Sequence, residues 1–185
     1  GSEMCIRDRY TDTATSGFIS ISADESFRRI VQQEIDVFES IYTMAGIDPI
    51  YASEVDAINL LLKDSVRLTV STRRLTDAEK AGLEEKKFFP KEFKVASDAI
   101  ALIVNRQNPD SIISLKDLSR ILTGEVTEWS ELYPGSKLGK LQLVFDNPNS
   151  STVRYAIDSI CRGRPLAGSL HAQKSNAEVI DFVSQ

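Results

Sequence analysis

Apolar side chains recur along the chain at two spacings, the alternation of a β-strand and the longer period of an amphipathic helix. Residues 18–22 alternate, which predicts a strand, and residues 27–41 carry a single apolar helical face. That face consists of Phe27, Ile30, Val31, Ile35, Phe38 and Ile41. Further strands are predicted at 47–51, 66–71, 93–97, 99–104 and 141–145. Strands that alternate with helices indicate an α/β fold with a largely parallel sheet.

Polar side chains that cap helices precede the other helical segments. Residues 76–79 and 175–178 both have the capping-box pattern, in which a hydroxyl side chain and a glutamate close the first turn. Other predicted helices follow a single hydroxyl residue. These residues are Ser53, Ser114 and Ser150. Gly124 is placed to end the helix that Ser114 begins.

The chain changes character near residue 100, where turn-rich residues 105–111 follow the predicted strands. We therefore expect two small lobes, residues 18–97 and residues 98–185, that meet between Ser97 and Arg106. Residues 1–17 are expected to be a disordered tail. In it, Gly1-Ser2 is typical of a cloning scar, residues 3–9 resemble translated adapter sequence, and residues 10–17 resemble the linker after a lipoprotein anchor.

Composition narrows the classes of function. The 185 residues are 42% hydrophobic and 26% charged, as in ordinary globular proteins, and a net charge of −5 argues against nucleic-acid binding. A bound anion must therefore be held by local groups. No apolar run is long enough to span a bilayer, and no export signal is evident. Cys5 and Cys161 are not expected to pair, and the single histidine, His171, excludes a histidine-rich metal site, so we expect no metal and no cofactor.

One loop concentrates hydrogen-bonding groups at the start of a helix. Between the strand at 141–145 and the helix that begins near Thr152 lie residues that cannot build a core: Asp146, Asn147, Pro148, Asn149, Ser150 and Ser151. The first amides of a helix lack partners and carry partial positive charge, so an anion can bind there. Hydroxyl-bearing junctions also follow the three N-terminal strands. The pattern suits an anion or small polar ligand in a cleft between the lobes, and equally suits ordinary helix caps.

Three segments resemble the phosphate-binding proteins of ABC importers, in order and at fitting intervals: DAIALIVNRQNP, LKDLSRILTGEVTEWSEL and DNPNSSTVRYAI. In the second segment the family's F-x-G-x-I-x-x-W positions are occupied by Leu122, Gly124, Val126 and Trp129. The resemblance runs from about residue 18 to residue 185 and implies a two-lobed, type II periplasmic-binding-protein-like fold. It also implies a fragment that is incomplete at its C-terminus. A missing returning segment would leave apolar surface exposed on the first lobe.

The resemblance also implies a ligand-binding set. Carried over by position, it comprises Ser26, Phe27, Ser53, Thr72, Ser150, Ser151, Thr152 and Arg154. Residues 150–152 correspond to the family's Ser-Gly-Thr phosphate loop, with a serine in place of the glycine. Thr72 stands where the family has an aspartate that accepts the proton of hydrogen phosphate, and Asp146 stands where it has an arginine.

These departures affect the expected selectivity. Arg154, or Arg73 and Arg74, could restore the lost positive charge. Without the aspartate, phosphate and sulfate should bind within about two orders of magnitude of each other, unless another carboxylate replaces it. The candidates for that replacement are Asp146, Asp24 and Glu54.

The resemblance implies a monomeric extracytoplasmic protein that captures phosphate and delivers it to the permease of an ABC importer, without catalysis. It would act in the periplasm or at the outer face of the membrane, with a lipid anchor. Alternatives are a binding protein for another oxyanion or a carboxylate, an enzyme acting on a phosphorylated substrate, and a surface structural protein that has lost its ligand. The acidic residues that an enzyme could use show no paired spacing. They are Asp24, Glu25, Glu54 and Asp146.

Overall fold

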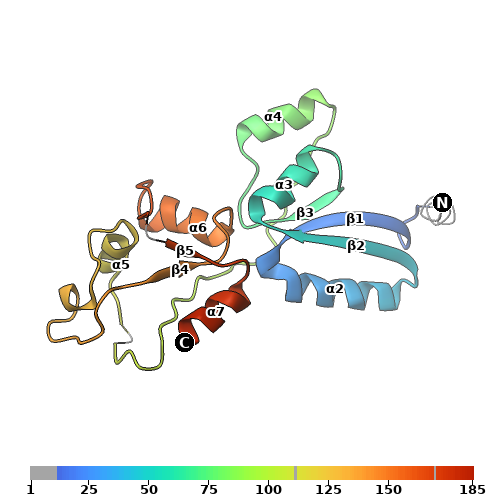
Figure 1. Cartoon of the computed structure of the whole chain (residues 1–185). Helices are drawn as coiled ribbons and strands as arrows, with labels where there is room; N and C mark the ends of the chain where they lie inside the picture. Colours follow the sequence, from blue (N-terminus) through green and yellow to red (C-terminus); the bar gives the residue numbers. More distant parts are fainter. Residues whose placement is uncertain (1–11, 111, 169) are drawn as a thin grey trace. The chain divides into compact units, whose positions relative to one another are not determined.

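The computed structural model describes residues 12–110, 112–168 and 170–185. The chain divides into two compact units, unit 1 up to Asp98 and unit 2 from Ala99. Figure 1 labels the helices and strands of both units. Among the described residues, no helix is long and apolar enough to cross a membrane.

Unit 1 is built on a parallel sheet. Its strands, within the described residues, are β1 (Ser16–Asp24), β2 (Met44–Ala52) and β3 (Leu68–Val70), in the spatial order β2-β1-β3. The register sets Asp24 opposite Ala52 and Ala23 opposite Val70. β1 is therefore the central strand, and its carboxyl end is the most deeply buried part of the sheet.

Helices cover both faces of this sheet (Figure 1). The 3-10 turn η1 (Glu25–Phe27) leads into α2 (Arg28–Ile41), which contacts β1 and β2, while α3 (Glu54–Leu62) contacts all three strands from the other face. The crossover from β1 to β2 and the crossover from β2 to β3 run in opposite directions across the sheet. Right-handed crossovers in opposite directions place their helices on opposite faces. The last helix of the unit, α4 (Asp77–Glu85), contacts α3.

The strands predicted at 93–97 and 99–104 do not form, so this prediction was wrong. These residues belong to no helix or strand, and the side chains of Phe93 and Val95 are 80% and 87% exposed. Alternating apolar residues become a strand only when a neighbouring strand supplies hydrogen bonds, and sequence periodicity does not report that neighbour.

Unit 2 carries a second, smaller parallel pair. It contains the strands β4 (Leu143–Phe145) and β5 (Leu170–Ala172) and the helices α5 (Leu115–Leu122), α6 (Ser151–Tyr155) and α7 (Asn176–Ser184). A 3-10 turn, η2 (Trp129–Glu131), lies between α5 and β4. α6 continues as a π-helical segment, η3 (Ala156–Ile160). α7 contacts β4, and α5 contacts η3. β5 was not predicted because three residues are too few to establish an alternating pattern.

The core of unit 2 forms where α5 meets η3. It consists of Leu118, Leu122, Ala156 and Cys161, with Phe145 packed against it. Cys161 is fully buried, as predicted for a small apolar side chain, and burial raises the pKa of its thiol. Gly124 follows α5 with a positive φ of 80°, which confirms the predicted stop.

Candidate functional site

The carboxyl ends of the unit 1 strands lie at one edge of the sheet. Asp24 ends β1 opposite Ala52, and the register between β1 and β3 places Ser71 at the same level. The loops that carry Ser26, Ser53 and Thr72 therefore leave from this edge. In parallel α/β sheets this is the edge at which ligands bind. We call it the carboxyl edge of unit 1.

Ser53 opens α3 as its N-cap. Its hydroxyl accepts a hydrogen bond from the Asp56 amide at 3.2 Å and lies 2.7 Å from Asp56 Oδ2. An ionised carboxylate has no proton to give, so the Ser53 hydroxyl donates to Asp56. The predicted cap is confirmed, and both hydrogen-bonding functions of the hydroxyl are used within the helix start.

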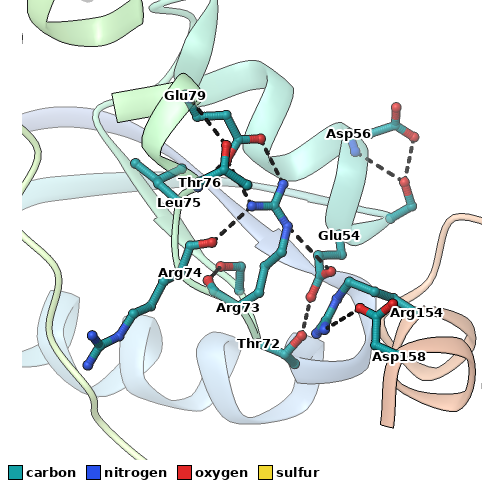
Figure 2. Close-up of polar contacts among 12 residues, drawn as sticks. Glu54, Asp56, Thr72, Arg73, Arg74, Leu75, Thr76, Glu79, Arg154 and Asp158 are labelled. Carbon is teal, nitrogen blue, oxygen red and sulfur yellow. Dashed lines mark hydrogen bonds and ion pairs between the residues drawn. The ribbon is translucent and has the colours of Figure 1, made fainter. Parts of the chain in front are cut away.

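Glu54, the next residue, is a carboxylate buried inside the fold, with 1% of its surface exposed. The Thr72 hydroxyl donates a hydrogen bond to Glu54 Oε2, and Arg73 Nε lies 3.9 Å from Glu54 Oε1 (Figure 2). Burying a carboxylate is costly unless it is paired and hydrogen-bonded, and these contacts compensate it. Thr72, predicted to contact the ligand, is thus also a partner of a buried acid.

Arg73 bridges this buried acid to α4. Its guanidinium donates to both oxygens of Glu79, each at 2.8 Å, in the two-pronged geometry that suits arginine and carboxylate (Figure 2). The hydrogen bond from Arg73 is the main cause that lowers the pKa of Glu79 from 4.5 to about 2. The same pair raises the pKa of Arg73. The positive charge of Arg73 is therefore paired with the carboxylates of Glu79 and Glu54.

The turn after β1 is organised by Asp24. Its Oδ1 accepts the amide of Ser26 at 2.9 Å, so Asp24 is the N-cap of η1. Asp24 is 2% exposed, and among the described residues its second oxygen, Oδ2, has no hydrogen-bond partner. Phe27, predicted as a ligand residue, is half-buried at the N-cap position of α2.

The β4–α6 junction of unit 2 resembles the β2–α3 junction of unit 1, because a serine caps the helix in both. Ser150 caps α6 by accepting the Val153 amide at 3.3 Å, and its hydroxyl donates to Asp146 Oδ1 at 2.6 Å. Asp146, Ser150 and Ser151 are buried, and Thr152 is half-buried. Asp146, which stands where the resemblance leads us to expect an arginine, thus orients the capping serine.

Two of the three arginines proposed to restore positive charge, Arg154 and Arg73, have carboxylate partners. Arg154 Nη1 lies 3.8 Å from Asp158 Oδ2, one helical turn further on, and Arg73 is held by Glu79. The carbonyl of Arg74 accepts a hydrogen bond from Arg73.

The predicted site residues therefore fall into two groups, one in each unit. Ser26, Phe27, Ser53 and Thr72 lie at the carboxyl edge of unit 1, and residues 150–154 lie at the β4–α6 junction of unit 2. That the two groups face one cleft stays a prediction.

Three hydroxyls of these two groups donate their protons to nearby carboxylates, which the sequence did not predict. Ser53 donates to Asp56, Thr72 to Glu54, and Ser150 to Asp146. Spacing hints at Ser53–Asp56, because the third helical position is the one that a cap reaches. The other two pairs join residues 18 apart or depend on a loop conformation, so they are evident only in the folded structure. No group of three or more His, Cys, Asp or Glu suited to a metal was found among the described residues.

Comparison with known proteins assigns the chain to a family. A family model described as a PBP superfamily domain matches residues 8–175, which is most of the chain. The chain belongs to the PBP superfamily. This confirms the resemblance to binding proteins and the predicted α/β architecture of the PBP type.

Among curated relatives of this PBP-superfamily chain are two phosphate-binding proteins named PstS. The one from Staphylococcus haemolyticus is 30% identical over 118 residues, which cover 61% of this chain and 32% of the relative. The one from Pseudomonas aeruginosa is 24% identical over 187 residues, covering 94% of this chain and 57% of the relative. The chain thus spans a third to somewhat over half of the length of these relatives.

Solved structures show the same fold. A candidate phosphate ABC transporter substrate-binding protein with bound phosphate, from Clostridium perfringens, matches with a TM-score of 0.77 at 21% identity. That match covers 90% of this chain and 66% of the other. An ABC-type phosphate transport receptor from Vibrio cholerae matches with a TM-score of 0.66 at 22% identity, covering 90% of this chain and 67% of the other.

Proposed function

We propose that the protein to which this chain belongs binds phosphate reversibly and presents it to the permease of an ABC importer. The observation that carries the proposal is the pair of hydroxyl-rich strand-to-helix junctions in a chain of the PBP superfamily, whose relatives are named for phosphate binding. Helix-start amides and hydroxyls can ligate an oxyanion without a full complement of cations. This fits a chain whose net charge is −5.

We assign the ligand contacts as follows. In unit 2, Ser151 and Thr152 supply hydroxyls in the first turn of α6, and Arg154 supplies charge, while Ser150 holds the turn in place through Asp146 and Val153. In unit 1, the carboxyl-edge group comprises Ser26, Phe27, Ser53 and Thr72. The hydroxyl protons of Ser53 and Thr72 go to Asp56 and Glu54, so we assign the donors of this group to the Ser26 hydroxyl and to backbone amides. Full function would take place outside the cytoplasm, with the protein held at the membrane by a lipid anchor.

Binding without catalysis is the simpler chemistry for these residues. Covalent catalysis needs a hydroxyl that both gives its proton to a base and directs its oxygen at the ligand. The buried acids here instead accept hydrogen bonds from a capping serine and from a threonine, and His171 packs its ring on Phe182 at 5.4 Å. A helix cap and a buried ion pair position a ligand, but they do not activate a nucleophile.

Calorimetric titration with phosphate tests the proposal. Ser151→Ala and Thr152→Val each remove one hydroxyl from the first turn of α6. Each should weaken binding by about tenfold or more, as expected for a hydrogen bond to a charged group. Ser159→Ala is the matched control, because Ser159 is exposed in the helical segment that continues α6. Absence of phosphate binding by the unmodified protein, or equal loss in the control, would refute the proposal.

A further inference from the structure

We propose that Arg28 is a positioning residue that holds the turn carrying Ser26 and Phe27 in the conformation that binds the anion. It acts through two neighbours, Glu25 within the turn and Tyr51 near the end of β2. This inference rests on the proposed function, which assigns ligand contacts to the turn. Arg28 itself is assigned no ligand contact, and it orders the turn before the anion binds.

The turn η1 needs stabilisation from outside itself. A single 3-10 turn has few hydrogen bonds, and their geometry is poorer than in an α-helix. At its start, the Asp24 carboxylate accepts the Ser26 amide at 2.9 Å. Ser26 and Phe27 are only half-buried, so close packing does not fix the rest of the turn. Contacts at its far end therefore decide whether the Ser26 hydroxyl and the neighbouring amides keep one direction.

An ion pair spans the turn. Arg28 Nε and Nη2 donate to the two oxygens of Glu25, each at 2.9 Å, in the two-pronged geometry of arginine and carboxylate. Glu25 directly precedes the two predicted ligand residues, and Arg28 directly follows them. The pair therefore restrains both ends of the segment that carries the ligand contacts.

The same guanidinium lies over an aromatic ring of the neighbouring strand. Arg28 Cζ is 4.3 Å from the centroid of the Tyr51 ring, within the distance of a cation–π interaction. Tyr51 stands opposite Ala23 in the sheet register, one residue before β1 ends. This contact therefore fastens the turn to the sheet at the carboxyl edge of unit 1.

Tyr51 is itself held by α2. Its hydroxyl donates to Gln32 Oε1 at 3.0 Å, and Gln32 Nε2 donates to Asp36 Oδ1 at 2.9 Å. A continuous set of contacts, which we call the Arg28 network, thus runs from Asp36 through Gln32, Tyr51 and Arg28 to Glu25. Isolated surface ion pairs contribute little to stability, but two-pronged pairs and networks are the exceptions.

A turn that is ordered in advance raises affinity without touching the ligand. The apparent dissociation constant equals the intrinsic constant divided by the fraction of molecules in the competent conformation. If loss of the Arg28 network leaves about a third to a tenth of the molecules competent, phosphate binds about three- to tenfold more weakly. The ligand contacts themselves stay in place, so binding is weakened and not abolished.

Calorimetric titration with phosphate tests this role. Arg28→Lys keeps the positive charge but removes the two-pronged donor and the flat guanidinium over the ring. It should weaken phosphate binding by about three- to tenfold. Tyr51→Leu removes the ring and should weaken binding by a similar factor. Tyr51→Phe keeps the ring under Arg28 and should recover most of the affinity that Tyr51→Leu loses.

Arg29→Lys is the matched control, because it makes the same change at the adjacent, exposed residue and should leave the affinity for phosphate unchanged. The Arg28 side chain is 53% exposed, so its replacement should leave the fold intact, which thermal unfolding checks.

Unchanged affinity in Arg28→Lys, or an equal loss in Arg29→Lys, overturns the inference and leaves phosphate binding standing. A loss in Tyr51→Phe as large as that in Tyr51→Leu would assign the effect to the hydrogen bond with Gln32 and overturn the role of Arg28. Absence of phosphate binding by the unmodified protein overturns the proposed function, and this inference with it.

Discussion

Single carboxylates decide much of the local structure of this chain. Asp56 and Asp146 fix the hydroxyls of the capping residues Ser53 and Ser150, and Glu79 fixes the guanidinium of Arg73. The serines were predictable because capping is a local interaction. The acidic partners of these hydroxyls were less predictable. Each contact depends on the direction of a side chain or on two segments that are distant in the sequence lying side by side in the fold.

The Arg73–Glu79 pair makes stability depend on pH. Because the pKa of Glu79 falls from 4.5 to about 2 in the folded state, its contribution is full above pH 4.5 and is lost as the pH falls toward 2. Glu79→Gln keeps an acceptor for the Thr76 amide and removes the charge. It should lower the free energy of unfolding at neutral pH by about 1–2 kcal/mol, a value reduced for partial exposure. Urea unfolding measured from neutral to acidic pH should show the difference shrink through that window.

Glu84→Gln is the control for this measurement, because Glu84 is exposed on the same helix. It should change the free energy of unfolding little at any pH. A deficit in Glu79→Gln that persists at the acidic end of the window would show that the charge of Glu79 is not its source.

A substitution at Ser150 tests the hydrogen bonds that hold the β4–α6 junction together. Ser150→Ala removes the acceptor of the Val153 amide and the donor of Asp146 Oδ1, both at buried positions. Unfolding free energy should fall by about 1–3 kcal/mol, since a lost cap and an unpaired buried acceptor both contribute. Ser150→Thr retains the hydroxyl and should recover most of the loss in the same urea experiment. Equal destabilisation by both substitutions would assign the effect to packing instead.

At the scale of elements, local signals predicted helices better than strands. The Thr76 capping box, the caps at Ser114 and Ser175, and the stop at Gly124 appear where the sequence places them. The second predicted capping box forms only in part, because Glu178 accepts the amide of Lys174 and not that of Ser175. The strands at 93–97 and 99–104 failed because pairing requires a partner strand. The π-helical segment that continues α6 was also missed, since its apolar spacing over one turn resembles that of an ordinary helix.

α5 has the clearest division between a buried and an exposed side. Leu122 is buried in the core of unit 2, whereas Leu115, at the start of the helix, is 75% exposed. Leu122→Ala should cost about 2–5 kcal/mol, the range for a large-to-small change in a core. Leu115→Ala, chemically the same change, should stay within about 0.5 kcal/mol. Chemical denaturation of the two variants side by side provides the measurement, and similar losses would contradict the assigned helix face.

At the scale of the whole molecule, the α/β class and the PBP fold could be predicted from the sequence. The alternation of strands and helices gave the class, and three segments gave the family resemblance. The candidate site was predicted as a set of hydroxyl residues, and the structure adds the buried acids that accept their protons. Glu54 and Asp146 were predicted as possible acceptors of a ligand proton. Their burial and their hydroxyl partners could not be predicted, because nothing in a single carboxylate's sequence neighbours reports its burial.

The division into two units predicts where a protease cuts first. Phe89 and Phe93 are 74% and 80% exposed and lie in a stretch, just before the division after Asp98, that forms no helix or strand. Exposed backbone without regular hydrogen bonds opens at low cost, so chymotrypsin should cut there before it cuts the helices. Leu115, equally exposed but held in α5, is the internal comparison.

Brief digestion followed by mass spectrometry should therefore give two fragments, one with the β2-β1-β3 sheet and one with unit 2. A Phe89→Ser, Phe93→Ser double variant should slow this first cut and leave later cuts unchanged. First cuts within α2 or α5 would mean that residues 88–98 are covered in solution, and hence that the apolar side chains of this segment have a packing partner.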